Sequence, residues 1–534
     1  MYDYIVVGGG SGGSVVASRL SEDPNTSVCL LEAGGPDKSI LIHVPLGMAA
    51  MLPRKINNWA FETVPQKGLN GRKGYQPRGK TLGGSSSINA MLYVRGNKWD
   101  YDHWASLGNN GWSYDEVLPY FKKAENNERG GDEFHGTGGP LNVADLRSPM
   151  GVNNVFQQAA KELQLPMNDD FNGAKQEGVG LFQTTQKNGE RWSAAKGYLT
   201  PNLDRPNLEV ITHAPATKIL MEGKRAVGIQ YLQNGKLNEI RANKEVILCG
   251  GAFATPQLLL LSGIGAAKDI QPHGIAHLHE LPGVGENLQD HIDYVSAYRS
   301  PSKETMGISL GGMVDIFKAI GQWRRERTGL LTSTAAETGA FLKSDPNLDI
   351  PDYQLHFVIG MLDDHARKTN LGYGFSCHAC VLRPKSRGTV KLNSPNPTEA
   401  PRIDPNFLDQ DEDVQVLLKG VKEMERILRA PAFDGVRGKP LYPVDLDDDE
   451  AIIEALRSRA DTVYHPVGSC KMGTDEMSVV DPELKVRGLE GLRIADASVM
   501  PTLVGGNTNA PTIMIGEKAA DMIRASQTVQ MEIA

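Results

Sequence analysis

The sequence predicts a mixed α/β fold (α+β overall), in which a buried parallel sheet and an antiparallel sheet belong to two interleaved domains. Near the N-terminus, the apolar run Tyr4–Val7 leads into the glycine cluster Gly8–Gly13 and then into a helical stretch that ends near Leu20. Strands without polar alternation are typical of parallel sheets that are buried on both faces. Residues 350 to 405 alternate instead in the manner of antiparallel strands. No flexible linker separates these patterns, so we expect the two domains to interleave.

The composition is that of a globular protein with a mildly acidic balance. Apolar residues make up 40% and charged residues 22% of the 534 residues, and the net charge is −8. This balance argues against nucleic acid as a partner. The length indicates more than one core and therefore two domains. No apolar run approaches the ~20 residues of a membrane-spanning helix, and no signal peptide follows Met1, so we expect a cytoplasmic protein.

The remaining elements have the periodicity of ordinary helices and strands. The expected helices are Asp115–Glu125, Gly151–Leu163, Asp411–Leu428, Asp447–Arg459 and one that starts at Thr512. The expected strands lie within Leu208–Tyr231, at Glu245–Leu248 and at Leu492–Ala495. A glycine run after Leu248 leads into a further helix, and we expect Pro256 in its first turn, where proline costs no helical hydrogen bond.

The five cysteines are scattered through the chain and do not form a disulfide framework. Cys377 and Cys380 are three residues apart in a predicted strand, so their side chains point to opposite faces. We therefore expect neither a disulfide nor a shared metal ion there, and no second cysteine or histidine pair completes a zinc site.

A glycine pattern at the junction of the first strand and helix predicts a dinucleotide site. In the pattern G-x-G-x-x-G, the first glycine permits a tight turn and the second lets the backbone approach a pyrophosphate at the helix N-terminus. Glu32 follows nineteen residues after Gly13, where a carboxylate accepts hydrogen bonds from a ribose and repels a 2′-phosphate. NADP is disfavoured, and FAD and NAD stay open. The expected members are Gly8, Gly10, Ser11, Gly12, Gly13, Glu32 and Ala33.

Four further blocks carry a family resemblance. They are Gly79–Asn89, Gly251–Pro256 with Ser262–Gly265, Leu281–His291, and the C-terminal group of Tyr464–Gly468, Asp496–Ser498 and Asn507–Thr512. In these blocks the chain resembles the glucose–methanol–choline (GMC) oxidoreductases nearly from end to end. Within the family, three blocks are most similar to acceptor-linked FAD-dependent alcohol dehydrogenases, and choline dehydrogenases share the same plan. These blocks are Leu181–Gly189, Asp363–Lys368 and Leu382–Gly388.

The resemblance implies FAD as the cofactor. The flavin-site residues that it implies are Gly83, Gly84, Ser85, Asn89, Ala90, Met91, Leu92, Ala216, Asp496, Ala497, Asn509, Pro511 and Thr512. Some relatives tether FAD through a histidine at the position held here by Ile88, so we expect non-covalent FAD. The implied Rossmann-like FAD domain covers residues 1–150, 195–300 and 460–534. The substrate domain, with its antiparallel sheet, covers residues 151–194 and 301–459.

The resemblance also implies an enzyme that oxidises a primary, aliphatic alcohol to an aldehyde, with hydride transfer to N5 of the flavin. A histidine suits the removal of the hydroxyl proton, because its ordinary pKa is near neutrality. His465 matches the catalytic histidine of the family, and Asn509 is expected to hold the alcohol oxygen against it. Glu337 and His356 match pocket residues of some relatives. Glu337 either binds a cationic substrate or is a buried, hydrogen-bonded carboxylate, and His356 lines the pocket or is satisfied within its strand.

Several alternatives stay open. The substrate could instead be choline, as in choline dehydrogenases and oxidases. The chain could also resemble the relatives that are hydroxynitrile lyases, which carry FAD without redox turnover, or could bind flavin without catalysis. The electron acceptor is a quinone, another carrier or O2, and the motifs do not distinguish these. They also leave the oligomeric state open.

One amphipathic stretch, Met313–Arg327, has apolar residues followed by Trp323 and two arginines. Two interpretations fit this pattern: a lid packed on the substrate domain, or a surface in peripheral contact with the inner face of a membrane or with an electron acceptor.

Overall fold

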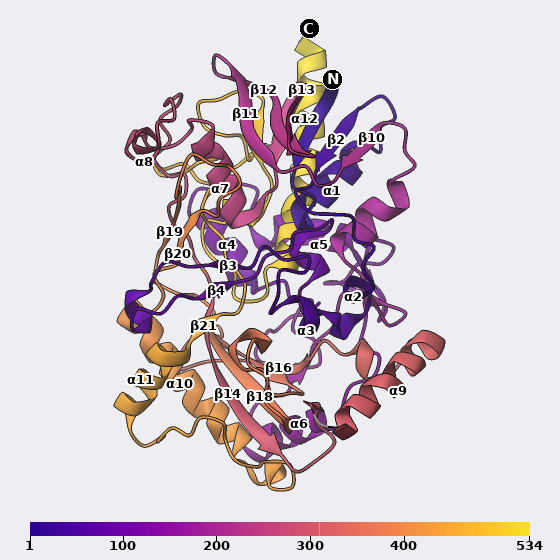
Figure 1. Ribbon diagram of the computed structural model, residues 1–534, viewed down its shortest axis with the longest axis vertical. Coiled ribbons are helices and arrows are strands. Elements are labelled where there is room, and N and C mark those ends of the chain that lie inside the picture. The colour runs from indigo at the N-terminus through magenta and orange to yellow at the C-terminus, as the bar shows by residue number, and fades with distance from the viewer. Residues whose placement is uncertain (309, 534) are drawn as a thin grey trace.

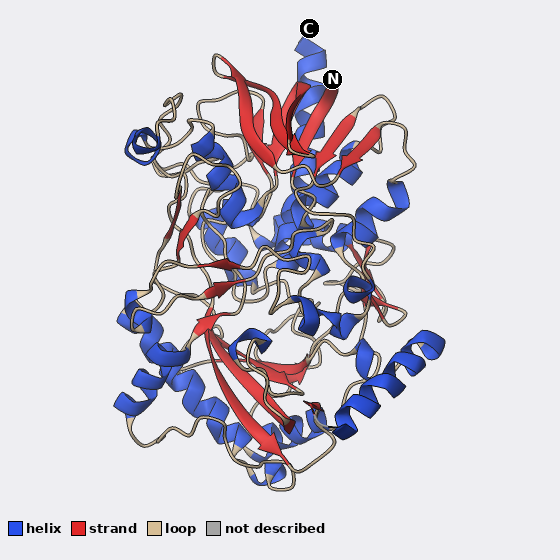
Figure 2. Cartoon of the chain, viewed as in Figure 1, coloured by secondary structure: helices blue, strands red, loops and turns tan. Residues whose placement is uncertain are grey.

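The computed structural model describes the backbone of residues 1–308 and 310–533 and the side chains of residues 1–308 and 317–526. Two large sheets dominate it, one in the upper and one in the lower half of Figure 1. Helices surround both sheets, and long loops occupy the region between them (Figure 2). The expected mixed α/β class, with one mainly parallel and one antiparallel sheet, is confirmed.

The first sheet is built around the N-terminal strand. Its order is β10–β2–β1–β13–β12–β11, with β22 beside β13. Strands β10, β2, β1, β13 and β22 are mutually parallel, whereas β13, β12 and β11 form an antiparallel extension. The strands are β1 Tyr2–Val7, β2 Val28–Leu31, β10 Leu208–Ile211, β11 Ala216–Glu222, β12 Arg225–Gln233, β13 Lys236–Leu248 and β22 Leu492–Ile494. Helices α1 (Ser11–Leu20) and α12 (Asn509–Ile533) pack against each other beside this sheet.

The second sheet is antiparallel, as the alternating pattern predicts. Its order is β21–β14–β18–β17–β16–β7, with β15 beside β18. The strands are β7 Gly178–Leu181, β14 Ile292–Ser300, β15 Gly307–Ile308, β16 Ala336–Leu342, β17 Tyr353–Val358, β18 Gly372–Val381 and β21 Asp461–Thr462. Helices α6 (Val152–Glu162) and α10 (Asp411–Leu428) pack on this sheet and share its apolar core.

The domain boundaries differ from the expected ones at two places. Strand β14 was expected in the first domain, but it pairs with β18 and β21 in the second sheet. Strand β21 likewise lies in the second sheet although it follows residue 460. We therefore propose that the substrate domain consists of residues 151–194, which contribute β7 and α6, and a second part that begins near residue 292 and ends near residue 462.

Smaller elements connect the sheets. The two-stranded pairs are β3 Phe61–Glu62 with β4 Tyr75–Gln76, β5 Glu125–Asn127 with β6 Leu141–Val143, β8 Gln186–Lys187 with β9 Glu190–Arg191, and β19 Thr389–Lys391 with β20 Arg402–Asp404. The other helices are α2 Ile40–His43, α3 Met48–Met51, α4 Lys98–Ser106, α5 Tyr114–Ala124, α7 Gly251–Leu261, α8 Ala267–Ile270, α9 Leu310–Glu326 and α11 Asp449–Arg459.

Helix α7 differs from the sequence prediction in the position of Pro256. It begins at Gly251, so Pro256 lies in its second turn and not in its first. Proline has no N–H, and the carbonyl of Ala252 therefore lacks its usual helical donor. The Ser469 hydroxyl donates to this carbonyl over 2.6 Å. A hydrogen bond from a distant segment thus replaces the missing helical one.

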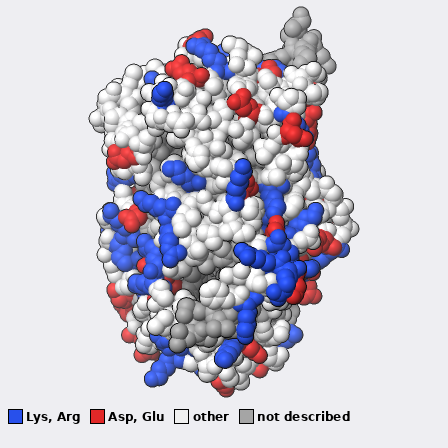
Figure 3. All heavy atoms as spheres, turned by 45° about the vertical axis from the view of Figure 1, so that its right-hand side comes forward, with Lys and Arg blue, Asp and Glu red and all other residues white. Residues whose placement is uncertain are grey.

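Helix α9 projects from the right-hand edge of Figure 1. Phe317, Lys318 and Ile320 are exposed, whereas Trp323 is buried and its Nε1–H donates to the carbonyl of Gly189. The other apolar side chains expected in this stretch, those of Val314 and Ile316, lie outside the described residues. Figure 3 shows Lys and Arg side chains gathered on this side of the molecule. No helix in the described part of the chain has the length and apolar content to cross a bilayer, and peripheral membrane contact stays a prediction.

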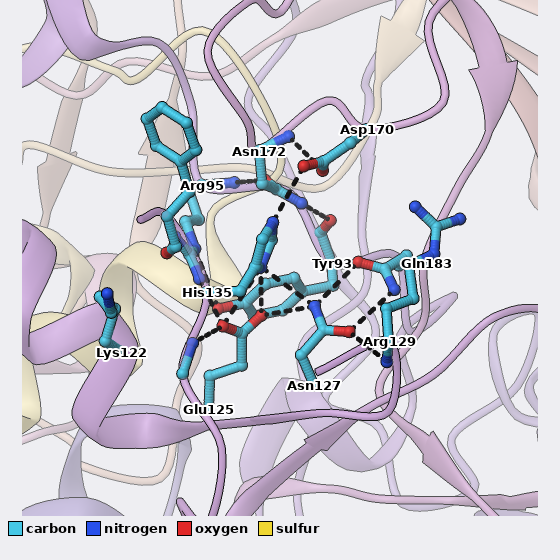
Figure 4. A network of polar contacts seen from close by, with 12 residues as sticks. Tyr93, Arg95, Lys122, Glu125, Asn127, Arg129, His135, Asp170, Asn172 and Gln183 are labelled. Carbon is cyan, nitrogen blue, oxygen red and sulfur yellow. Dashed lines mark hydrogen bonds and ion pairs between the residues drawn. The ribbon is translucent and has the colours of Figure 1, made fainter. Parts of the chain in front are cut away.

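A buried charge network fixes the segment that follows Leu92 (Figure 4). The Arg95 guanidinium is 2.7 Å from Oε2 of Glu125, and Glu125 accepts a second contact from His135 Nδ1 at 3.1 Å. On its other side, His135 Nε2 is 2.9 Å from Asp170. Burial acts to lower the pKa of His135, but its hydrogen bonds to Asp170 and Glu125 outweigh this effect and raise the pKa to about 9.

The raised pKa makes the stability of the protein depend on pH. The protonated ring is favoured in the folded state, so its contribution is complete below pH ~6.5 and is lost as the pH rises through about 9. We expect the variant His135→Gln to be less stable than wild type by about 1–3 kcal/mol at pH 6, and this difference to shrink by pH 10. Thermal unfolding at both pH values measures it, and a difference that is constant with pH would contradict the assignment.

Candidate active site

A cavity of about 570 Å3 extends from the glycine turn of the first sheet to strand β17 of the second. Most of the residues expected at the dinucleotide site line it. They are Gly8, Gly10, Ser11, Gly12, Glu32, Ala33, Gly84, Ser85, Asn89, Ala90, Met91, Leu92, Ala216, Asp496, Ala497, Asn509 and Thr512. Three other expected residues, Gly13, Gly83 and Pro511, lie outside this lining.

The turn between β1 and α1 requires glycine for reasons of space. Gly8 has a φ of +104°, and a Cβ on Gly13 would lie 1.9 Å from the carbonyl oxygen of Gly8. Gly13 thus permits the helix to approach the strand, although it does not reach the cavity. Helix α1 has no acidic residue in its first turn, and Gly10 precedes it without a side-chain cap. The free amides at this helix start favour an anionic group such as a pyrophosphate.

A second glycine turn lies directly against the first. The N–H of Gly83 donates to the carbonyl of Gly9 over 2.7 Å. A Cβ on Gly84 would lie 2.8 Å from Cα of Gly10, so the two backbones are in contact. A Cβ on Gly10 itself would meet only Cα of Gly84, at 4.0 Å, and would otherwise enter open space. We call this opening at Gly10 the dinucleotide cradle. A flat or anionic ligand can enter it, and a side chain at position 10 would fill it.

Two buried carboxylates border this end of the cavity. Glu32 accepts the N–H of Gly9 at 2.9 Å and that of Gly34 at 2.7 Å, which leaves a further lone pair on each oxygen for a ribose. Burial raises the pKa of Glu32 to about 7. Asp496 accepts the N–H of Gly251 and the hydroxyl of Thr255, and it thereby joins the end of β22 to the start of α7.

At the opposite end, His465 faces Asn507. The side-chain Nδ2 of Asn507 is 3.2 Å from Nε2 of His465. The backbone N–H of His465 donates to Asp290 over 2.9 Å. Burial, followed by the neighbouring His291, His356 and Arg78, holds the pKa of His465 well below its ordinary value of 6.5. The ring is therefore neutral at pH 7 and can accept a proton.

The sequence predicts that Asn509 lies against His465, but the structure places Asn509 elsewhere. The side-chain oxygen of Asn509 accepts a hydrogen bond from the Ser11 hydroxyl at 2.7 Å, on the dinucleotide side of the cavity. Helix α12 starts at Asn509, and Asn507 lies in the turn before it. The segment Asn507-Thr508-Asn509 indicates an asparagine near the site. Which of the two asparagines faces His465 depends on where helix α12 starts.

The two expected pocket residues have different environments. His356 lines the cavity, and neither of its ring nitrogens has a hydrogen-bond partner within the protein. Burial lowers the pKa of His356 to about 3. Glu337 does not line the cavity. Its carboxylate accepts hydrogen bonds from the N–H of Met150, the side chain of Asn153 and the hydroxyl of Ser333.

Comparisons with known proteins identify the family. The family profile described as GMC oxidoreductase matches residues 2–293 with its N-terminal part and residues 384–516 with its C-terminal part. The chain belongs to the GMC oxidoreductase family. It is therefore an enzyme of the oxidoreductase class, and the expected resemblance is confirmed.

Similar proteins from this family match over nearly the full length. An alcohol dehydrogenase (acceptor) of Pseudomonas putida is 49% identical over 98% of this chain and 96% of that protein. An oxygen-dependent choline dehydrogenase of Pseudomonas fluorescens is 43% identical over 100% of this chain and 95% of that protein. A solved structure of a formate oxidase variant from Aspergillus oryzae, studied for FAD modification, has a TM-score of 0.91 at 27% identity, over 99% of this chain and 98% of that one.

The open space at Gly10 provides a selective test of the dinucleotide cradle. We expect Gly10→Val to fold but to retain no dinucleotide, because the added side chain occupies the cradle and meets little protein. The matched variant Gly13→Val is expected to fail to fold, since its Cβ collides with the carbonyl of Gly8. Circular dichroism and the absorbance of dinucleotide released by acid denaturation measure both effects. A Gly10→Val protein with a full complement of dinucleotide would place the ligand elsewhere.

Proposed function

We propose that this GMC oxidoreductase oxidises an uncharged primary alcohol to an aldehyde with non-covalently bound FAD. The observation that carries the proposal is a neutral, buried histidine, His465, at one end of a cavity whose other end is a cradle for a dinucleotide. A base and an electron-accepting cofactor in one cavity supply the two removals that alcohol oxidation requires, a proton and a hydride.

The residues present fit FAD. The amides at the start of α1 and the glycine turn at Gly84 would hold its pyrophosphate, and Glu32 its ribose. The chemistry that FAD supplies when bound is the acceptance of a hydride from the alcohol carbon. Ile88 lines the cavity and offers no nucleophile for a covalent bond, which supports dissociable FAD.

The protein side of the reaction falls to His465 and Asn507. Nε2 of the neutral His465 can take the hydroxyl proton of the alcohol. The amide of Asn507, 3.2 Å from that nitrogen, can donate to the alcohol oxygen as negative charge develops on it. His356, with no partner in the protein, is a further polar group available to this oxygen. We assign the role expected for Asn509 to Asn507, and we assign Asn509 to the cofactor side.

The charge of the cavity favours an uncharged substrate. Among the described residues, the carboxylates in the lining are Glu32 and Asp496, and both are held by backbone amides beside the glycine turns. Glu337 is occupied by three hydrogen bonds outside the lining, so it offers no counter-ion to a cation. The rest of the lining is largely apolar, with Met306, Val358, Met361 and Leu362 among its members, and its cationic residues are Arg54, Arg78 and Lys368. An aliphatic alcohol suits this surface better than choline does.

An anaerobic absorbance titration tests the substrate class. We expect 1-octanol to bleach the flavin bands and choline to leave them unchanged at equal concentration, because no free carboxylate compensates the desolvation of a quaternary ammonium. Bleaching by choline alone would move the function to choline oxidation. Bands that bleach with neither compound would favour another alcohol or a non-redox role of the hydroxynitrile lyase kind.

Variants of His465 and of the two asparagines test the assignment of the base and its partner. We expect His465→Ala to keep FAD and to lower kcat for alcohol oxidation by about 10²-fold or more, as the loss of a general base does. Asn507→Ala should lower kcat by about 10-fold or more while FAD is retained. Asn509→Ala should instead weaken FAD binding, because it removes the partner of Ser11 on the cofactor side. Stopped-flow reduction and flavin content separate these outcomes, and the reverse pattern for the two asparagines would restore the assignment to Asn509.

A further inference from the structure

A second histidine lies behind His465 and has no place in the mechanism above. His291 is completely buried, and its Nδ1 is 2.9 Å from Nδ1 of His465. The two rings meet edge to face, with centroids 5.1 Å apart. His291 does not line the cavity, so it is not positioned to contact the substrate.

We propose that His291 is a positioning residue that holds the proton of His465 on Nδ1 and so keeps Nε2 free to act as the base. The inference rests on the proposed function of His465. It assigns His291 a role in setting the tautomer of another residue, through a hydrogen-bond chain that begins at a backbone carbonyl.

The direction of the hydrogen bonds can be followed outward from the protein interior. Nε2 of His291 is 2.9 Å from the carbonyl oxygen of Leu382. A carbonyl can only accept, so Nε2 of His291 carries a proton. Burial lowers the pKa of His291 to about 3, so the ring is neutral and its Nδ1 has no proton. His465 must therefore donate from its own Nδ1, and its Nε2 is left with a lone pair.

At the cavity end of the chain, the contact between Asn507 and His465 indicates the same tautomer of His465. Nδ2 of Asn507 lies 3.2 Å from Nε2 of His465, and Oδ1 of Asn507 accepts from the side chain of Gln354 at 3.3 Å. The amide nitrogen thus faces the histidine and can only donate, so Nε2 of His465 is the acceptor. Two separate contacts, at the two ends of the chain, are satisfied by the same tautomer of His465.

The backbone reinforces this arrangement. The N–H of Val463 donates to the carbonyl of His291 over 3.1 Å, and the N–H of His465 donates to the neighbouring Asp290 over 2.9 Å. The segment Asp290–His291 therefore holds both the main chain and the ring of His465. When Nε2 takes a proton, the neutral Nδ1 of His291 remains an acceptor and stabilises the resulting imidazolium.

Three substitutions separate this role from simple packing. His291→Phe keeps a ring but offers no acceptor, and we expect kcat to fall by about 10²-fold or more with KM changed by less than about threefold, since a misplaced tautomer proton disables a catalytic histidine. His291→Asn places an amide oxygen near the position of Nδ1 and should recover activity to within about tenfold of wild type. His291→Gln carries the same amide one methylene further and should recover less than His291→Asn.

The pH profile provides a readout that a packing role would not move. The charged and titratable groups that act on His465 are His291, His356 and Arg78, and Asp290 holds its backbone. Activity requires neutral His465, so kcat/KM falls on the acid side of its pKa. A charged His291 would lower the pKa of His465, but burial lowers the pKa of His291 itself to about 3, so near neutral pH its ring is uncharged and acts as an acceptor. Loss of this acceptor in His291→Phe removes support from the imidazolium, and the acid limb should move to lower pH; in His291→Asn it should stay near that of wild type.

A chemical probe tests the same point without turnover. Diethyl pyrocarbonate acylates an unprotonated imidazole nitrogen, and peptide mass spectrometry follows the rate at His465. We expect slower acylation of His465 in His291→Phe than in wild type and in His291→Asn. Equal rates and an unmoved acid limb in His291→Phe would overturn the proposal, as would equal loss of activity in all three variants. Failure of wild type to oxidise any alcohol would instead refute the proposed function, while the acylation rates would still test His291.

Discussion

Close contact between two glycine turns sets the geometry of one end of the cavity. The turn before α1 and the turn at Gly83–Gly84 touch through their backbones, and any side chain at Gly84 would collide with Gly10. This contact forms the cradle at one end of the cavity. It also brings the segment after Gly84, which continues into Ile88 and Leu92, along the cavity wall. The buried charge network around Arg95 then fixes the end of that segment.

The interleaving of the two sheets places His465, the proposed base, opposite this cradle. His291 directly precedes β14, and His465 follows β21, and these two strands pair in the second sheet. Asn507 comes from the turn before α12, whose first turn touches α1 beside the first sheet. His465, beside the second sheet, and Asn507, beside α12, therefore meet where the two domains join.

Burial and hydrogen bonding determine the charge of the polar groups in and around the cavity. Each carboxylate near the site is already held: Glu32 and Asp496 by backbone amides, and Glu337 by three donors outside the lining. His356 and His465 have the opposite condition, because burial lowers the pKa of each, and His356 has no hydrogen-bond partner in the protein. A buried charge needs compensation that an apolar wall does not provide. These conditions support the proposed neutral substrate and the proposed base, His465.

Features that have a local physical cause could be predicted from the residue pattern. The G-x-G-x-x-G turn, the uninterrupted apolar strands, the alternating strands of the second sheet and the helix bounds of Asp411–Leu428 all follow from neighbouring residues. The family motifs also led to His465. Three features could be seen only in the folded chain: Asn507 faces His465, Glu337 is hydrogen-bonded outside the cavity, and His291 lies behind His465. These outcomes depend on hydrogen bonds between residues far apart in the chain, such as the 174 positions between His291 and His465, and no local pattern encodes such a contact.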